Sequence, residues 1–197
     1  MRSLPAHLQL KNFNTNQEAL ERLQIIEDNM HIILEHTDIM RTSRIMHDEP
    51  EVWRLSWQLG EVRLAFHKIF PCHECFFHPH PWPSLVKCLK GGYIHQIGIY
   101  NGAKEDVMTI RSETIEVFSN NLIPMRTMVS SGDIYIMTDI RHFHQVSTNQ
   151  CSYSLMIMGE QYFQGASKQF SRITPKQNIL LEEEQIQDIL TVIHQQY

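Results

Sequence analysis

The stretch "CFFHPHPWPSLVKCLKGGY", residues 75–93, sets His78 and His80 two positions apart and follows them with Pro81-Trp82-Pro83. In a β-strand, residues i and i+2 point to the same face, so an extended conformation would project both imidazoles to one side. Two imidazoles that converge on one point are typical of a metal site. A third ligand must then come from elsewhere in the chain.

The composition is that of an ordinary globular protein. The chain has 197 residues, 42% hydrophobic and 20% charged, with a formal net charge of −5. Without a basic block, neither a nucleic-acid nor an anionic-membrane partner is indicated. No apolar run approaches the roughly 20 residues of a membrane-spanning helix, and the first residues lack a signal-peptide pattern. We therefore expect a soluble, cytoplasmic protein.

The cysteines do not indicate a disulfide scaffold, because the four are few and unevenly placed. Cys72 and Cys75 have the Cys-x-x-Cys spacing of a zinc knuckle or a redox pair. There is no second such pair, so a zinc site would need histidines from the same loop. We interpret the pair as two partly buried thiols at the end of a strand.

Both ends of the chain have helical periodicity. Thr15 and Glu18 form a capping-box signature, and residues 16–36 are predicted to be one helix. A second helix is predicted near the C-terminus, where four apolar residues form a stripe: Ile186, Ile189, Leu190 and Ile193.

The middle of the chain alternates with a period of two. Apolar Leu55 and Trp57, for example, alternate with polar Arg54 and Ser56. Short strands separated by Gly, Asn, Asp or Ser are typical of an antiparallel sandwich or barrel. The predicted strands are 51–58, 61–70, 84–89, 93–100, 106–110, 126–129, 133–137, 144–147 and 153–158.

A second histidine cluster lies in "SSGDIYIMTDIRHFHQVS", residues 130–147. His142 and His144 are again two apart, so alternation places both on one face. Either could supply the third ligand. If His144 does, His142 is a residue at the rim, a fourth ligand, or a donor that orients the other imidazoles.

The first cluster resembles the first motif of the cupin superfamily. That motif has two histidines two apart, then a glutamate, then a glycine seven residues beyond it. His78 and His80 match the histidines, Ser84 stands where the glutamate is expected, and Gly91 lies seven residues further on. Gly132 and His144 are similar to the start and end of the second cupin motif, so the resemblance favours His144 over His142 as the third ligand.

The resemblance covers about residues 51–159 and implies a fold. We expect a mainly β protein with a cupin-type antiparallel β-barrel (a double-stranded β-helix, or jelly roll), flanked by N- and C-terminal α-helices. The expected division is an N-terminal helical extension (1–50), the barrel (51–160), and a C-terminal linker and helix packed on the barrel (161–197).

The chain departs from the cupin pattern at the glutamate, which neither Ser84 nor Leu85 can replace. His78, His80 and His144 then form a three-histidine set, which resembles that of the thiol dioxygenases, cupins that hold ferrous iron with neutral histidines. The resemblance implies a divalent metal, with Fe²⁺ first and Zn, Ni or Mn as alternatives.

The thiol dioxygenases also use a histidine and a tyrosine near the end of the barrel. The corresponding positions here are Met156 and Met158, which cannot transfer a proton. The resemblance therefore extends to the metal site and not to cysteine oxidation. Tyr93, His95 and His142 are the titratable candidates for catalysis instead.

Two function classes follow. The first is a mononuclear Fe(II), dioxygenase-like oxidoreductase that acts on a small polar or anionic molecule. The second is a non-catalytic cupin that binds a small molecule or a protein partner, its metal structural or absent. Arg54 and Arg63 could meet an anionic substrate, although a solvated sheet face explains both equally well. The outer helices could form a homodimer interface.

Overall fold

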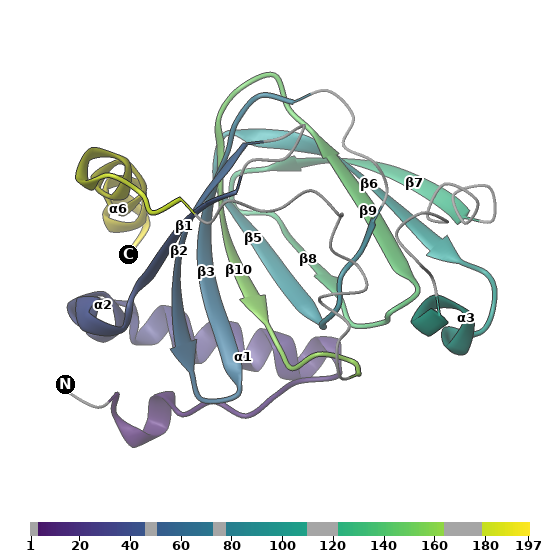
Figure 1. The fold of residues 1–197 in the computed structure, drawn as a ribbon, viewed down its shortest axis with the longest axis horizontal. Coiled ribbons are helices and arrows are strands. Elements are labelled where there is room, and N and C mark those ends of the chain that lie inside the picture. Colours follow the sequence, from purple (N-terminus) through teal and green to yellow (C-terminus); the bar gives the residue numbers. More distant parts are fainter. Residues whose placement is uncertain (1–3, 46–50, 73–77, 110–121, 164–178) are drawn as a thin grey trace.

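The computed structural model describes residues 4–45, 51–72, 78–109, 122–163 and 179–197. Two antiparallel sheets dominate it (Figure 1). The six-stranded sheet has the order β1-β2-β3-β10-β5-β8, and the four-stranded sheet has the order β4-β9-β6-β7. The strands are β1 (Arg41–Ile45), β2 (Val52–Leu59), β3 (Val62–Ile69), β4 (His78–Pro79), β5 (Ser84–Lys90), β6 (Gly92–Tyr100), β7 (Leu122–Ser130), β8 (Ile134–Met137), β9 (His142–Ser147) and β10 (Ser152–Met158).

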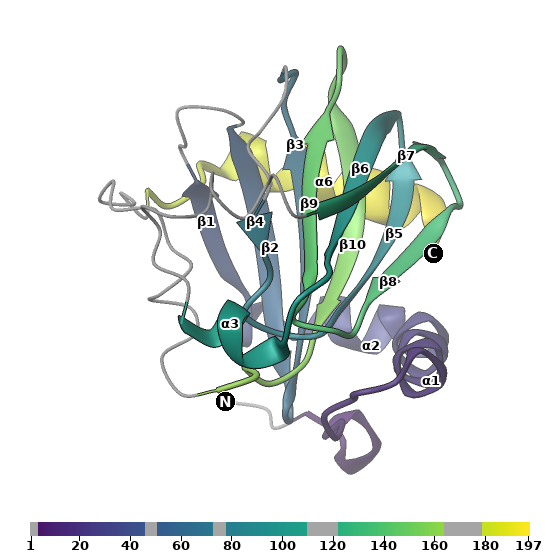
Figure 2. The same cartoon turned by 90° about the vertical axis from the view of Figure 1, so that its right-hand side faces the viewer.

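The helices lie outside the sheets. They are α1 (Asn16–Asp28), α2 (Met30–Glu35), α3 (Lys104–Thr109) and α6 (Glu183–Gln196), with 3-10 turns at η1 (Ala6–Leu8) and η2 (Thr37–Ile39). Figures 1 and 2 show α1, α2 and α6 on the side of the six-stranded sheet that faces away from β6, β7 and β9. Within the described ranges, no helix is both long enough and apolar enough to cross a membrane.

The predicted N-terminal helix is present but divided in two. It begins at a capping box, in which Thr15 Oγ1 accepts a hydrogen bond from the Glu18 N–H (3.2 Å) and the Glu18 carboxylate accepts one from the Thr15 N–H (3.1 Å). It is interrupted at Asn29, whose side-chain amide donates to the Ile25 carbonyl oxygen at 2.8 Å. This local bond competes with the helical ladder, so α1 ends and α2 begins there.

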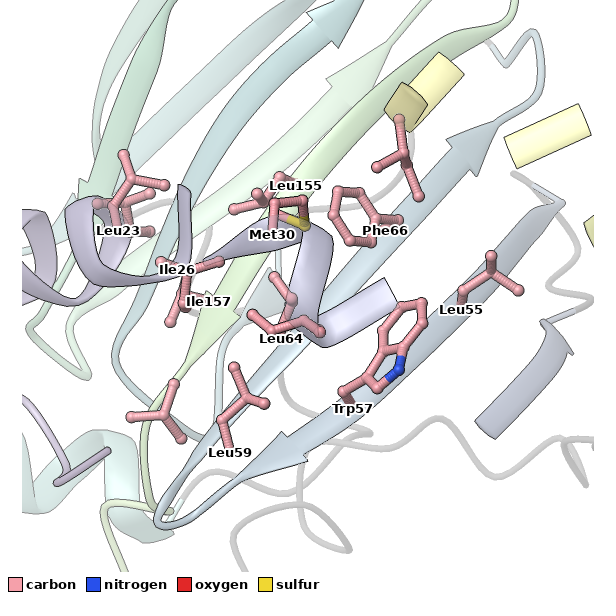
Figure 3. Close-up of a cluster of buried hydrophobic side chains, with 14 of the residues drawn as sticks. Leu23, Ile26, Met30, Leu55, Trp57, Leu59, Leu64, Phe66, Leu155 and Ile157 are labelled. Atoms are coloured by element: carbon pink, nitrogen blue, oxygen red, sulfur yellow. The ribbon is translucent and has the colours of Figure 1, made fainter. Parts of the chain in front are cut away.

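The main hydrophobic core lies between the outer helices and the six-stranded sheet (Figure 3). Leu55 and Trp57 of β2 and Leu64 of β3 are at most 1% exposed and point toward this layer. Leu23, Ile26 and Met30 from α1 and α2 pack against them, as Figure 3 shows. The alternation in β2 and β3 therefore buries apolar residues beneath helices, and the polar alternate residues take the opposite face.

That opposite face looks into the barrel, toward the four-stranded sheet. The two sheets meet there in a cluster of buried side chains from β5, β6, β7 and β9: Cys88, Tyr93, Val129 and Val146. Tyr135 of β8 also crosses to β6, where its ring stacks on His95 with 4.0 Å between ring centroids. The predicted mainly β architecture, an antiparallel barrel with flanking helices at both ends, is confirmed.

Some elements differ from the prediction. Residues 104–109 form helix α3, so the predicted strand at 106–110 is wrong; residue 110 lies outside the described ranges. The polar strand β1 was not expected, and the extended stretch expected at His78 and His80 forms a strand, β4, of only two residues. Because β1 pairs with β2, the sheet begins before the boundary expected at residue 51. Cys75 is outside the described residues, and Cys72 is buried.

Candidate metal centre

Strand β4 brings the two histidine clusters side by side. His78 lies directly opposite His144 in the antiparallel pairing of β4 with β9. β4 is an edge strand of only two residues, and the prolines at 79 and 81 explain this, since proline has no N–H to donate to a ladder. His80 follows at once, so both histidines of the motif lie beside β9.

The three imidazoles converge. One ligand atom each from His78, His80 and His144 can be chosen so that all lie within 4.8 Å of one another. The Nε2 atoms of His80 and His144 are 2.7 Å apart. The ring centroids of His78 and His144 are 4.6 Å apart. Three imidazole nitrogens aimed at one point suit a divalent transition metal and leave coordination positions open.

Burial favours the neutral form of His80 and His144. It lowers the pKa of His80 well below its ordinary value, and electrostatic interactions with His78, His95 and Arg54 lower it further. The pKa of His144 is likewise lowered by burial and then by the neighbouring histidines. Neutral imidazole is the form that binds a metal, so proton competition is weak near neutral pH.

His95 orients His144 from behind. Its Nε2 lies 3.1 Å from Nδ1 of His144, and its own ring is held against Tyr135. For Nε2 of His144 to keep its lone pair, the proton must be on Nδ1, which then donates to His95. Burial, followed by the charge of His78, lowers the pKa of His95 to about 4, so His95 is a neutral acceptor.

Tyr93 and His142, the other catalytic candidates, lie differently. The Tyr93 hydroxyl donates to the Tyr135 hydroxyl at 3.2 Å, so it reaches the histidines only through Tyr135 and His95. His142 shares a strand with His144 but is outside the three-histidine group. Its buried Nδ1 has no hydrogen-bond partner among the residues that the structure describes.

Sequence reasoning passed over two residues near this group. His67 of β3 is buried, and its Nε2 accepts a hydrogen bond from Nε of Arg54 at 2.8 Å. Tyr135 supports His95. Both alternate with apolar residues that face outward. The alternation in "AFHKIF" and "DIYIM" could therefore have indicated that the His67 and Tyr135 side chains face the interior of the barrel.

Comparison with known proteins gives structural similarity only. No family model and no curated protein matches the chain. Similar solved structures include Fe(II)-HppE with the alternative substrate (S)-1-HPP, at 11% identity and TM-score 0.42, covering 61% of this chain and 56% of that one. HEPD of Streptomyces albus, with 2-hydroxyethylphosphonate and Fe(II) bound, has 11% identity and TM-score 0.43, covering 61% and 24%.

An RmlC-like cupin from Shewanella frigidimarina has 7% identity and TM-score 0.39, covering 61% of this chain and 86% of that one. This chain thus spans less than two thirds of the HppE and HEPD chains.

Proposed function

We propose that this protein is a metal-dependent cupin enzyme in which His78, His80 and His144 hold one divalent metal, Fe(II) in the first instance. The convergence of three imidazoles, with ligand atoms within 4.8 Å of one another, is the observation that carries the proposal. Ferrous iron in such a site supplies dioxygen-dependent oxidation of a small polar or anionic molecule, whereas Zn, Ni or Mn would polarise a carbonyl or activate water.

The surrounding residues support a reactive site. His95 holds His144 in one tautomer and is itself a titratable group that is not a ligand. Trp82 lies beside His80, with ring centroids 6.3 Å apart, and packs on an apolar patch of the inner face. That patch consists of Ala65, Val86, Met156 and Met158. Apolar walls exclude water and strengthen the electrostatic interactions of a bound substrate.

The alternative is a non-catalytic cupin, and two observations favour it. Ser84 stands in place of the cupin glutamate, and Met156 and Met158 lie on the inner face where a proton-transferring pair would be useful. In that case the metal is structural or absent, and the barrel binds a small molecule or a protein. The expected homodimer and the cytoplasmic location also remain predictions.

The two classes are separated by whether the metal has open positions. The purified protein is reconstituted anaerobically with Fe(II) and exposed to nitric oxide, and electron paramagnetic resonance is recorded. The enzyme proposal predicts the half-integer-spin signal of a ferrous nitrosyl adduct, lost in His80→Ala. Stoichiometric iron that gives no adduct would mean a closed, structural site.

A further inference from the structure

Three arginines lie on the inner face of the six-stranded sheet. In β2, Arg54 alternates with the core residue Leu55, and in β3, Arg63 alternates with the core residue Leu64. Arg41 of β1 pairs directly with Ser56 on the same face. Small residues, Ser56 and Ala65, face each other between Arg54 and Arg63. The register therefore arranges positive charge around a stretch of inner wall with short side chains.

Arg54 and Arg63 face the three-histidine group. The charge of Arg54 contributes to lowering the pKa of His80. The guanidinium of Arg63 lies over the Trp82 ring, 4.7 Å from its centroid, and Trp82 is the neighbour of His80. Arg54 and Arg63 therefore lie on the side of the barrel that the proposed metal faces.

Neither guanidinium has a negative partner within the described ranges. Nε of Arg54 donates to His67, and Nη2 of Arg63 lies 3.1 Å from the weakly accepting sulfur of Met158. Three arginines elsewhere are paired with carboxylates: Arg22, Arg44 and Arg141.

Such an arrangement is costly without a counter-charge. Burial, followed by the charge of Arg63, lowers the pKa of Arg54 to about 10, so the group is still protonated at neutral pH. Two neighbouring partly buried cations repel each other and lose hydration. An anion between them would relieve both effects, because guanidinium presents a fork of donors that matches an oxyanion.

Two further polar atoms in the same region are unpartnered. Ser84 Oγ and Trp82 Nε1 are buried and form no hydrogen bond within the described part of the chain. Ser84 lies opposite Met158 in the β5–β10 pairing, and Met158 lies opposite Arg63 in the β10–β3 pairing. Buried donors without partners are rare in native proteins, and a bound ligand is one of the things that satisfy them.

We propose that Arg54 and Arg63 form an anion subsite beside the three histidines, which binds a compact oxyanion of the substrate. This rests on the proposed function, since the same molecule would extend toward the metal position. Carboxylate, phosphonate and sulfonate groups share the required chemistry. The hydroxyl of Ser84 and the indole N–H of Trp82 supply further donors to the anion.

The test is calorimetric titration of metal-free full-length protein with acetate, methylphosphonate and methanesulfonate, and with neutral acetamide as the isostere. The proposal predicts binding of at least one oxyanion, and the tightest identifies the class. Arg54→Gln and Arg63→Gln are each expected to weaken that binding by about 10- to 100-fold. Arg22→Gln, which changes a paired arginine on α1, is the matched control and is expected to leave it unchanged.

Metal content is measured on the same samples, so that a failure of the anion-subsite proposal can be distinguished from a failure of the metalloenzyme proposal. Arginine-dependent oxyanion binding in a protein that takes up no metal would support the subsite and refute the metalloenzyme. Metal uptake without arginine-dependent oxyanion binding would overturn the subsite alone. If a variant fails to fold, a measurement on the wild type still tests the subsite. The midpoint temperature of its thermal unfolding must rise when the oxyanion is added, and must not rise with acetamide at equal ionic strength. An unchanged midpoint would also overturn the subsite.

Discussion

At the scale of single residues, His144 is the central residue of the proposed metal site. Its Nε2 faces His80 and its Nδ1 faces His95, so one ring joins the proposed ligand set to its support. His95→Ala removes that support and is expected to weaken metal binding by about 10- to 100-fold, as for other residues that orient ligands. Chelator competition with Zn²⁺ or Fe(II) measures the affinity.

The His95 effect has a specific control. His95→Gln retains an acceptor that the Nδ1–H of His144 can reach, so it is expected to restore part of the affinity. Equal affinity in the wild type and in His95→Ala would show that His95 has no orienting role.

His67 makes a separate prediction about pH. It accepts from Arg54 and must be neutral, and burial, followed by the charge of Arg54, lowers its pKa well below the ordinary value. As pH falls below about 6.5, the unfolded chain binds a proton here that the native protein does not, so stability is lost.

His67→Gln keeps an acceptor and removes the titration. Urea unfolding of the metal-free protein at about pH 7.5 and about pH 5 measures the effect. The free energy of unfolding is expected to fall less on acidification in the variant than in the wild type. An identical fall in both proteins would mean that His67 titrates alike in the folded and unfolded states.

At the scale of elements, the β2–β3 turn depends on Gly60. Its φ is +68°, and a Cβ there would lie 2.6 Å from the Leu10 carbonyl oxygen. Backbone strain at such a position costs about 1–3 kcal/mol. Because the added Cβ would also clash, Gly60→Ala is expected to lower the free energy of unfolding by more than the strain alone. Gly132 also has a positive φ, +92°, but a Cβ there would meet nothing within 4 Å. Gly132→Ala is the control, and equal losses in urea unfolding would contradict the steric argument.

The elements that sequence could predict are those with a strong local signal. The capping box at Thr15 begins α1 as expected, and alternating apolar residues locate β2 and β3. Most of the residues of α3 were predicted to form a strand, because a short apolar run does not distinguish the period of an α-helix from that of a β-strand. Its Asp106 accepts from the Ala103 N–H, a local bond that favours a helical turn. β1 reads "RTSRI" and has no alternation to reveal it.

At the scale of the molecule, the barrel has two differently used faces. The outer face of the six-stranded sheet carries the main core, and its inner face looks toward the three histidines, two of which lie on β4 and β9 of the four-stranded sheet. Leu64→Ala, at a fully buried core position, is expected to destabilise the protein by about 2–5 kcal/mol. Metal content of the folded variant should not change. Loss of metal from a folded Leu64→Ala protein would contradict the separation of the two faces.

This division explains what the sequence could reveal about the site. His78 and His80 lie in one short motif and His144 in another, and the resemblance of both motifs to the cupin pattern predicted that the three would meet. The roles of His67, Arg54 and Tyr135 depend on strand order and register, which bring β2, β3 and β8 around the same interior. Pairing between strands distant in sequence is not encoded in any single segment.

The most direct test of the central claim is elemental analysis of purified wild-type protein and of His78→Ala, His144→Ala and His142→Ala, each after anaerobic reconstitution with Fe(II). We predict about one metal per chain in the wild type and in His142→Ala, and loss of metal in the other two variants. No metal in the wild type, or metal that persists in His144→Ala, would contradict the three-histidine centre.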